Sequence, residues 1–401
     1  MNDVAHPGHV PNELFSDVDI YDLPGAADDP QAAWKALHRD GGPGVIWTPR
    51  NGGHWIVTSG RKTLELMADI ENLSARELSV PPGNSIYPLI PNQSDEPEHR
   101  HYRNIVMPFV TPHAVAALSG NVRALARSLI QALQPRGACD FMAKFARHVP
   151  MLIFLQLMEL PADDREYLIE RADVMTRSND TAKRIIAQQE IMAYLQERID
   201  RRRARPGQDM LSAIIHGKVG GRPMNHAEIM GESMDLLFGG LDTVAAMTGF
   251  IMRFLARHPT HRRQLIEART LLPKAVEELL RRHSVATVAR RVLKTIEING
   301  VTLHAGDMVV LSTVMHAMDE TLWPAPLSVD FNRPAQQIGT FGLGVHTCIG
   351  ARLARSEVTI MLDEWLTHIP DFEIAAEDDG RGLSGAVNSL SSLRLVWPIA
   401  N

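Results

Sequence analysis

Cys348 is the residue with the clearest capacity for chemistry, and it lies in the run Phe341-Gly342-Leu343-Gly344-Val345-His346-Thr347-Cys348-Ile349-Gly350. The glycines of this run allow close backbone packing, and a long helical pattern begins directly after it. A thiolate there gains from the positive end of a helix and from nearby backbone N–H groups, so it can bind a metal. A lone cysteine is more often a small buried hydrophobe, so the residue alone leaves both interpretations open.

The run Gly239-Gly240-Leu241-Asp242-Thr243 is a second candidate, and it lies near the centre of a long predicted helix. Asn225 and Glu228 have the spacing of a capping box, and the helical pattern continues to about His258. Such a helix is about 50 Å long at 1.5 Å per residue. Each central glycine costs roughly 1 kcal/mol relative to alanine, so a group approaches the backbone there or the helix is locally opened. On its own, the Asp-Thr pair favours local backbone capping.

Two further segments set charged residues on one face of a helix. Glu278 and Arg281 are three residues apart, and His99 and Arg103 are four apart. Pairs at this spacing are common on exposed surfaces and are worth only a few tenths of a kcal/mol. Neither segment indicates a function by itself.

Taken together, these segments resemble the cytochrome P450 family. The Cys348 run matches the haem-binding loop Phe-x-x-Gly-x-(His or Arg)-x-Cys-x-Gly of that family. The resemblance extends from His54 to Trp397 and is greatest to the bacterial camphor-monooxygenase branch. It implies that Cys348 is the axial thiolate of haem b, the ligand that favours O–O cleavage. It also places Phe341, Gly342, His346 and Gly350 around the haem.

The resemblance implies further roles around the haem. Asp242 and Thr243 relay protons to dioxygen, a step that must not admit excess water. The donors to the haem propionates are His99, Arg103, Arg291 and His346, and the adjacent Arg290 leaves the third of them open by one residue. Glu278, Arg281 and Arg333 form a buried network that supports the haem loop and takes no part in the chemistry.

The substrate pocket is also assigned by resemblance. Tyr87 matches the tyrosine that donates a hydrogen bond to a substrate ketone, although packing against the proline-rich loop is an equally good interpretation. The remaining pocket positions are mainly apolar, with Asp235 in place of an apolar residue: Leu89, Asp235, Phe238, Gly239, Ala386 and Val387. An apolar wall with one donor predicts a terpenoid or norisoprenoid ketone as substrate.

The pattern of the whole chain predicts a mainly α protein with small β sheets. Residues 1–90 and 286–330 are β-rich, with strands expected at 44–48, 54–58, 291–293, 295–298 and 308–311. Residues 96–283 and 349–369 have helical periodicity, and 389–397 looks like a final strand. We expect one domain, 1–401, with the P450 fold and its long central helix crossing above the haem.

Composition excludes several classes of protein. A net charge of −6 argues against nucleic-acid binding, because such proteins usually carry a basic field. Two cysteines rule out a disulfide scaffold and a four-cysteine metal site. The polar, acidic start has no signal peptide, and the apolar stretch 149–160 is shorter than the ~20 residues of a membrane span. We therefore expect a cytoplasmic protein that does not enter a membrane.

The expected activity is monooxygenation of a small apolar molecule with O2. By resemblance, electrons come from NADH through a flavoprotein reductase and a [2Fe–2S] ferredoxin, which Arg100 and Arg103 help to dock. A peroxide-driven haem-thiolate enzyme is one alternative, which the Asp242-Thr243 pair argues against. A haem-binding sensor or carrier without turnover is another, and the sequence leaves it open.

Overall fold

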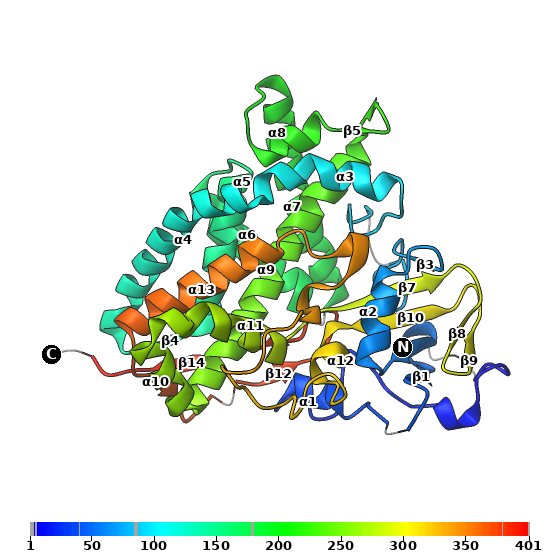
Figure 1. Ribbon diagram of the computed structural model, residues 1–401. Coiled ribbons are helices and arrows are strands. Elements are labelled where there is room, and N and C mark those ends of the chain that lie inside the picture. Colours follow the sequence, from blue (N-terminus) through cyan, green and yellow to red (C-terminus); the bar gives the residue numbers. More distant parts are fainter. Residues whose placement is uncertain are drawn as a thin grey trace.

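A computed structural model describes residues 4, 6–39, 41–83, 87–177, 180–378 and 380–399. Most of the chain is helical, and Figure 1 shows the large helical part beside a smaller region of strands. Residues 1–3 lie outside the described residues. They belong to the amino terminus for which we predict no signal peptide. The α-helices are α1 (Pro30–Lys35), α2 (Gly60–Ala68), α3 (Glu98–Val106), α4 (Pro112–Leu133), α5 (His148–Leu157), α6 (Arg165–Arg177), α7 (Thr181–Ala204), α8 (Met210–Ile215), α9 (His226–Arg257), α10 (Pro259–Glu267), α11 (Leu272–Arg282), α12 (Thr313–Met318) and α13 (Ala351–His368).

The strands form small sheets. The largest described sheet has five strands in the order β1-β2-β10-β7-β3, with β10 parallel to β2 and antiparallel to β7. A second sheet has the order β11-β14-β4, and the remaining strands pair as hairpins. The strands are β1 (Val45–Thr48), β2 (His54–Val57), β3 (Leu73–Ser74), β4 (Ala138–Asp140), β5 (Lys218–Val219), β6 (Arg222–Pro223), β7 (Thr287–Val292), β8 (Ile296–Ile298), β9 (Val301–Leu303), β10 (Met308–Ser312), β11 (Glu373–Ile374), β12 (Gly382–Leu383), β13 (Ser389–Leu390) and β14 (Arg394–Val396).

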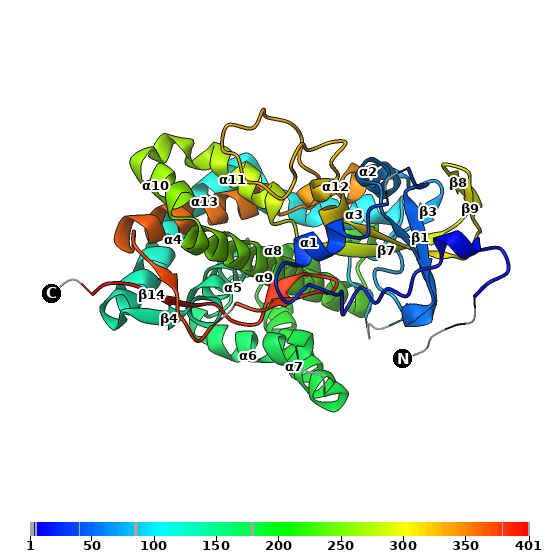
Figure 2. The same cartoon turned by 90° about the horizontal axis from the view of Figure 1, so that it is seen from below.

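α9 runs through the middle of the helical part, as both views show (Figures 1 and 2). The predicted capping box is present, since the Asn225 side chain accepts from the Glu228 backbone N–H and the Glu228 side chain accepts in return. The main apolar core surrounds the carboxyl-terminal half of α9 and includes Phe250, Trp365 and Phe145. This packing fixes the position of the central turn of α9, residues 239–243, relative to the core.

The sequence-based boundaries hold with small differences. The strand predicted at 291–293 begins four residues earlier, because β7 pairs with β10 from Thr287 onward. The final strand predicted at 389–397 is divided into β13 and β14. α9 is continuous, so the prediction that the helix is opened at its glycines is wrong.

α9 is also long and apolar enough to cross a membrane by length and composition, as is the bent pair 98–110 and 112–136. These segments are longer than the apolar stretch 149–160, on which the expectation of no membrane span was based. In the most apolar window of α9, 67% of the residues are buried inside the structure, as in a core helix. Length and composition are therefore weak evidence for a membrane span here.

Candidate functional site

The loop before α13 presents Cys348 on a tightly packed turn. The backbone N–H of Cys348 donates to the carbonyl oxygen of Phe341 at 2.8 Å. Gly344 has φ +80°, and a Cβ atom there would lie 2.8 Å from the Ala68 Cα of α2, so only glycine lets the loop approach α2. The Phe341 ring is held from the other side by the Arg355 guanidinium, 4.3 Å from the ring centre.

An open space, which we call the hollow, lies between α9 and the Cys348 loop. Gly239 and Gly240 are exposed although they lie in a buried helix, and a Cβ atom on either would meet no atom within 4 Å. Cys348 is likewise exposed although protein surrounds it. Phe238 and Ile349, the neighbours of these residues, pack against the same apolar cluster. No protein atom of the described residues fills the space beside these glycines, so they leave room for another group to approach the backbone.

The electrostatics of Cys348 favour a positively charged ligand. Burial raises the pKa of its thiol, while the backbone N–H of Gly350 and the charge of Arg103 oppose that effect. The thiol therefore keeps its proton in the protein alone. A metal ion replaces that proton readily, because thiolates are the form that binds metals.

Asp242 and Thr243 follow Gly239 and Gly240 by two to four residues on α9, next to the hollow. Both are partly exposed, whereas the flanking Leu241 and Val244 are buried. The Thr243 hydroxyl donates to the Gly239 carbonyl oxygen at 2.8 Å, one turn back along α9. This is the local bond that the bare sequence favoured, and it leaves the lone pairs of the hydroxyl oxygen available.

A group of basic residues gathers near the Cys348 loop. The His99 and His346 rings lie 4.2 Å apart, and burial lowers the pKa of both, that of His346 to about 3. The charge of the buried Arg290 depresses both pKa values further, so its side chain is directed toward them. The half-buried Arg103 faces Cys348 and has no carboxylate partner within the described part of the chain. Carboxylates bound here would supply the missing negative charge.

Arg291 is directed away from this group. Successive side chains of a strand point to opposite faces, so Arg290 and Arg291 of β7 cannot both face His99. Arg291 is 39% exposed, lies 3.5 Å from Glu77 and donates to the Gly306 carbonyl oxygen at 3.4 Å. Of the two arginines that the sequence leaves open, Arg290 is the one whose charge acts on His99 and His346.

The predicted support network is assembled. The Arg281 side chain donates to Glu278 at 2.8 and 2.9 Å, and Arg333 donates to the same carboxylate at 3.0 Å. Arg281 also donates to the carbonyl oxygens of Ala317 and Pro326, both at 2.9 Å. The network therefore ties α11 to the irregular segment that precedes the Cys348 loop.

The predicted pocket residues are only partly brought together. Leu89 and Phe238 pack on one apolar cluster, and Val387 packs at the edge of the core that contains Val244. Ala386 is exposed and accepts from the Thr287 backbone at the start of β7.

Tyr87 packs against the same apolar cluster as Leu89 and Phe238. Its ring lies edge-on to His226, with the ring centres 6.0 Å apart, at the amino-terminal end of α9. That point is about 20 Å along the helix axis from Gly239, since each residue adds 1.5 Å. Asp235 is buried, and Asn92 donates a hydrogen bond to its carboxyl group. No pattern in the sequence marks Asn92 as a site residue.

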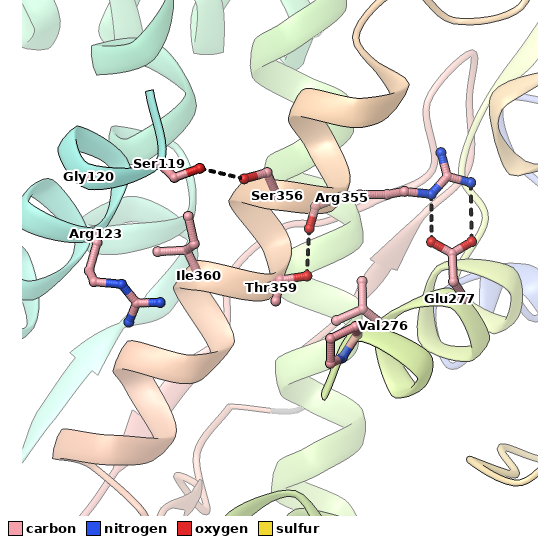
Figure 3. A pocket seen from close by; sticks show the side chains of 10 residues that line it. Ser119, Gly120, Arg123, Val276, Glu277, Arg355, Ser356, Thr359 and Ile360 are labelled. Atoms are coloured by element: carbon pink, nitrogen blue, oxygen red, sulfur yellow. Dashed lines mark hydrogen bonds and ion pairs between the residues drawn. The ribbon is translucent and has the colours of Figure 1, made fainter. Parts of the chain in front are cut away.

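A groove of about 490 Å³ lies on the surface between α4, α11 and α13 (Figure 3). Its polar groups satisfy one another: Ser119 and Ser356 are 3.4 Å apart, and Arg355 pairs with Glu277 through both carboxylate oxygens. It has no clustered reactive side chains, so the hollow remains the candidate active site.

The residues around the hollow fit a haem. The space has a thiol on one side, helix backbone without side chains on the other, and unpaired or weakly paired cations nearby. In the described residues no group of three or more His, Cys, Asp or Glu side chains could hold a metal ion by itself. A metal carried by a macrocycle and held by one protein ligand agrees with this arrangement.

Comparison with known proteins gives consistent matches. The family model described as Cytochrome P450 matches residues 165–374. The chain is 32% identical to a probable cytochrome P450 127A1 of Sinorhizobium fredii (strain NBRC 101917 / NGR234), over 98% of this chain and 96% of that protein. It is similar to the crystal structure of cytochrome P450 CYP101C1, with 40% identity, a TM-score of 0.89 and coverage of 98% and 100%. The crystal structure of CYP101J2 matches with 37% identity, a TM-score of 0.90 and coverage of 99% and 100%.

Proposed function

This chain belongs to the cytochrome P450 family, and we propose that it inserts one atom of O2 into a small apolar ketone of the terpenoid or norisoprenoid class. It is a haem-thiolate monooxygenase with the fold of that family, mainly α with small sheets. The observation that supports the proposal is the open space at Gly239 and Gly240, next to Asp242 and Thr243 on α9, together with the exposed thiol of Cys348.

We assign the axial thiolate to Cys348. The second cysteine, Cys139, lies on β4 within the apolar core, and burial raises the pKa of its thiol to about 12. When bound, the haem activates dioxygen and oxidises a C–H bond of the substrate. Arg103 and Arg290 supply the charges that hold its carboxylates, with His99 and His346 beside them.

Asp242 and Thr243 are proposed to handle protons. Oxygen activation needs protons at the hollow but must exclude bulk water. The Thr243 hydroxyl can exchange its bond to Gly239 for one to a molecule in the hollow, and Asp242 precedes it at the same rim. This pair argues for an enzyme that uses O2 rather than one driven by peroxide.

We further propose that electrons reach the protein from NADH through a flavoprotein reductase and a [2Fe–2S] ferredoxin. The Arg100 side chain is 72% exposed on α3, and its one ion pair among the described residues is with Glu96, at 3.6 Å. Arg100 can therefore attract an acidic partner by long-range electrostatics. Arg103 is half-buried and faces Cys348, so it suits haem binding better than docking. We propose that the whole chain acts as one domain. It would act in the cytoplasm, where a diffusing ferredoxin can reach it.

The substrate class is tested by titrating the purified haem protein with a panel of ligands and recording its Soret band. Camphor-like ketones and ionones should produce the spectral change that accompanies loss of the haem water ligand. Fatty acids and planar aromatics serve as the comparison. If only these comparison ligands shift the band, the ketone proposal is wrong.

Turnover is tested by NADH consumption with ferredoxin and reductase, with product measured in the same sample. Product formation that depends on both proteins is the expected result. A protein that binds the ketone and haem but forms no product would be a sensor or carrier.

A further inference from the structure

One face of α9 carries two buried carboxyl groups in addition to Asp242. Glu232 and Asp235 lie three residues apart, and Asp242 follows Asp235 by seven residues, so the three carboxyl groups lie on one face of the helix. Asp235 also lies one turn before Gly239. Neither Glu232 nor Asp235 has a basic side chain within ion-pair distance among the described residues. Buried acids without a cation are costly unless they are neutral.

Glu232 is a fully buried carboxyl group without a hydrogen-bond partner among the described residues. Burial raises its pKa well above the ordinary value, and the charges of Asp235 and Glu228 raise it further. Burial therefore favours the neutral form of Glu232, which lies three residues before Asp235 on α9.

Asp235 is held in place by the loop before α3. A Cβ atom on Gly231 would lie 2.1 Å from the Pro88 carbonyl oxygen, so glycine lets this loop rest on α9. One turn further along, the Asn92 side-chain amide donates to Asp235 Oδ1 at 3.0 Å. Asn92 thus fixes the carboxyl group in one orientation.

Asp235 lies one helical turn before Gly239, on the face of α9 that leads to the hollow. Its charge raises the pKa of the Cys348 thiol, whereas Arg103 lowers it. Burial raises the pKa of Asp235 itself to about 7, against the opposing effect of Asn92. Asp235 can therefore exist with or without its proton near neutral pH.

We propose that Asp235, positioned by Asn92, holds the substrate by donating its carboxyl proton to the carbonyl oxygen of the ketone. This inference rests on the proposed function and names the residue that selects the substrate. A neutral acid is a good donor to a carbonyl oxygen, whereas a carboxylate can only accept.

Ketone binding should therefore weaken with rising pH. The groups that face Asp235 are the neutral Glu232 on its own helix, Asn92 of the loop, and Cys348 across the hollow. A group with a pKa of about 7 is roughly 90% protonated at pH 6 and roughly 10% at pH 8. If the hydrogen bond is worth about threefold to tenfold, the ketone affinity should fall about twofold to fivefold between these values.

Three ligands separate the possible contacts: a bicyclic ketone, its alcohol and its parent hydrocarbon. Their affinities are measured by Soret titration and by calorimetry at pH 6 and pH 8. The wild-type preference for ketone over hydrocarbon should fall about twofold to fivefold with pH, while hydrocarbon binding stays constant. If the alcohol binds better as the pH rises and the ketone shows no such fall, Asp235 acts as an acceptor and the proposal is overturned.

Variants identify the residue. Asp235→Asn keeps a donor that does not titrate, so it should keep the ketone preference and lose the pH dependence. Asp235→Leu should lower ketone affinity at pH 6 about threefold to tenfold, the value of one hydrogen bond, and leave hydrocarbon binding unchanged. Glu232→Gln and the exposed control Asp163→Asn should keep the wild-type pattern. A wild-type pattern in Asp235→Leu would overturn the proposal.

Stability gives a readout that needs no ligand. Because the folded pKa of Asp235 is raised, the folded protein binds its proton more tightly than the unfolded chain, and this contribution to stability is lost as the pH rises toward 7. Asp235→Leu should thus raise the melting temperature more at pH 8 than at pH 5. An equal change at both values would show that Asp235 is ionised throughout.

Failure of this inference is distinguishable from failure of the proposed function. If the reduced protein with carbon monoxide lacks the band of thiolate-bound haem, the proposed function fails. If that band is present and the ligands bind without regard to Asp235, only the present inference fails.

Discussion

Replacement of Glu278 by glutamine tests the buried network beneath the Cys348 loop. Glu278 is 6% exposed and is the carboxylate that Arg281 and Arg333 share. The Asp330 backbone N–H also donates to it, at 3.1 Å. Glutamine removes the negative charge and turns an N–H donor toward a guanidinium. Removing one partner of a buried ion pair costs about 3–5 kcal/mol.

The neighbouring Glu277 offers a matched control on the same helix. The Glu277 side chain is 43% exposed and that of its partner Arg355 is 35% exposed. Glu277→Gln should therefore lower the free energy of unfolding by no more than about 1 kcal/mol. Urea unfolding followed by far-UV circular dichroism gives the free energy of unfolding of both variants. Equal losses below about 1 kcal/mol in both would refute the reasoning that Glu278 neutralises two buried cations.

Three further predictions concern the site. Arg290→Leu should weaken haem retention during gel filtration, while Arg291→Leu should not; the reverse order would return the propionate contact to Arg291. Thr243→Ala should keep haem content and NADH consumption but divert electrons to peroxide, and an unchanged product yield per NADH would remove Thr243 from the mechanism. Arg100→Glu should slow the first electron transfer from ferredoxin, measured by stopped flow, and reduce its dependence on salt. An unchanged rate would place the docking surface elsewhere.

Local sequence was sufficient for features that depend on short spacings. The Asn225 capping box and the i, i+3 pair of Glu278 with Arg281 are set by helix geometry alone. The glycines around Cys348 likewise encode a tight turn before a helix. These features were therefore predictable without any knowledge of the rest of the chain.

Features that depend on distant packing were not predictable in this way. The choice between Arg290 and Arg291 depends on which face of β7 meets the site, and the pairing with β10 fixes that face. The contact of Asn92 with Asp235 joins residues 143 apart, and no local pattern marks it. The position of Tyr87 similarly depends on how its loop packs on α9.

The most direct test of the account is the absorption spectrum of the reduced holoprotein with carbon monoxide, compared among wild type, Cys348→His and Cys139→Ser. Wild type and Cys139→Ser should show the strongly red-shifted Soret band of thiolate ligation, and Cys348→His should show the band of a nitrogen-ligated haem. A thiolate band that survives in Cys348→His, or is lost in Cys139→Ser, would contradict the assignment of Cys348 as the haem ligand.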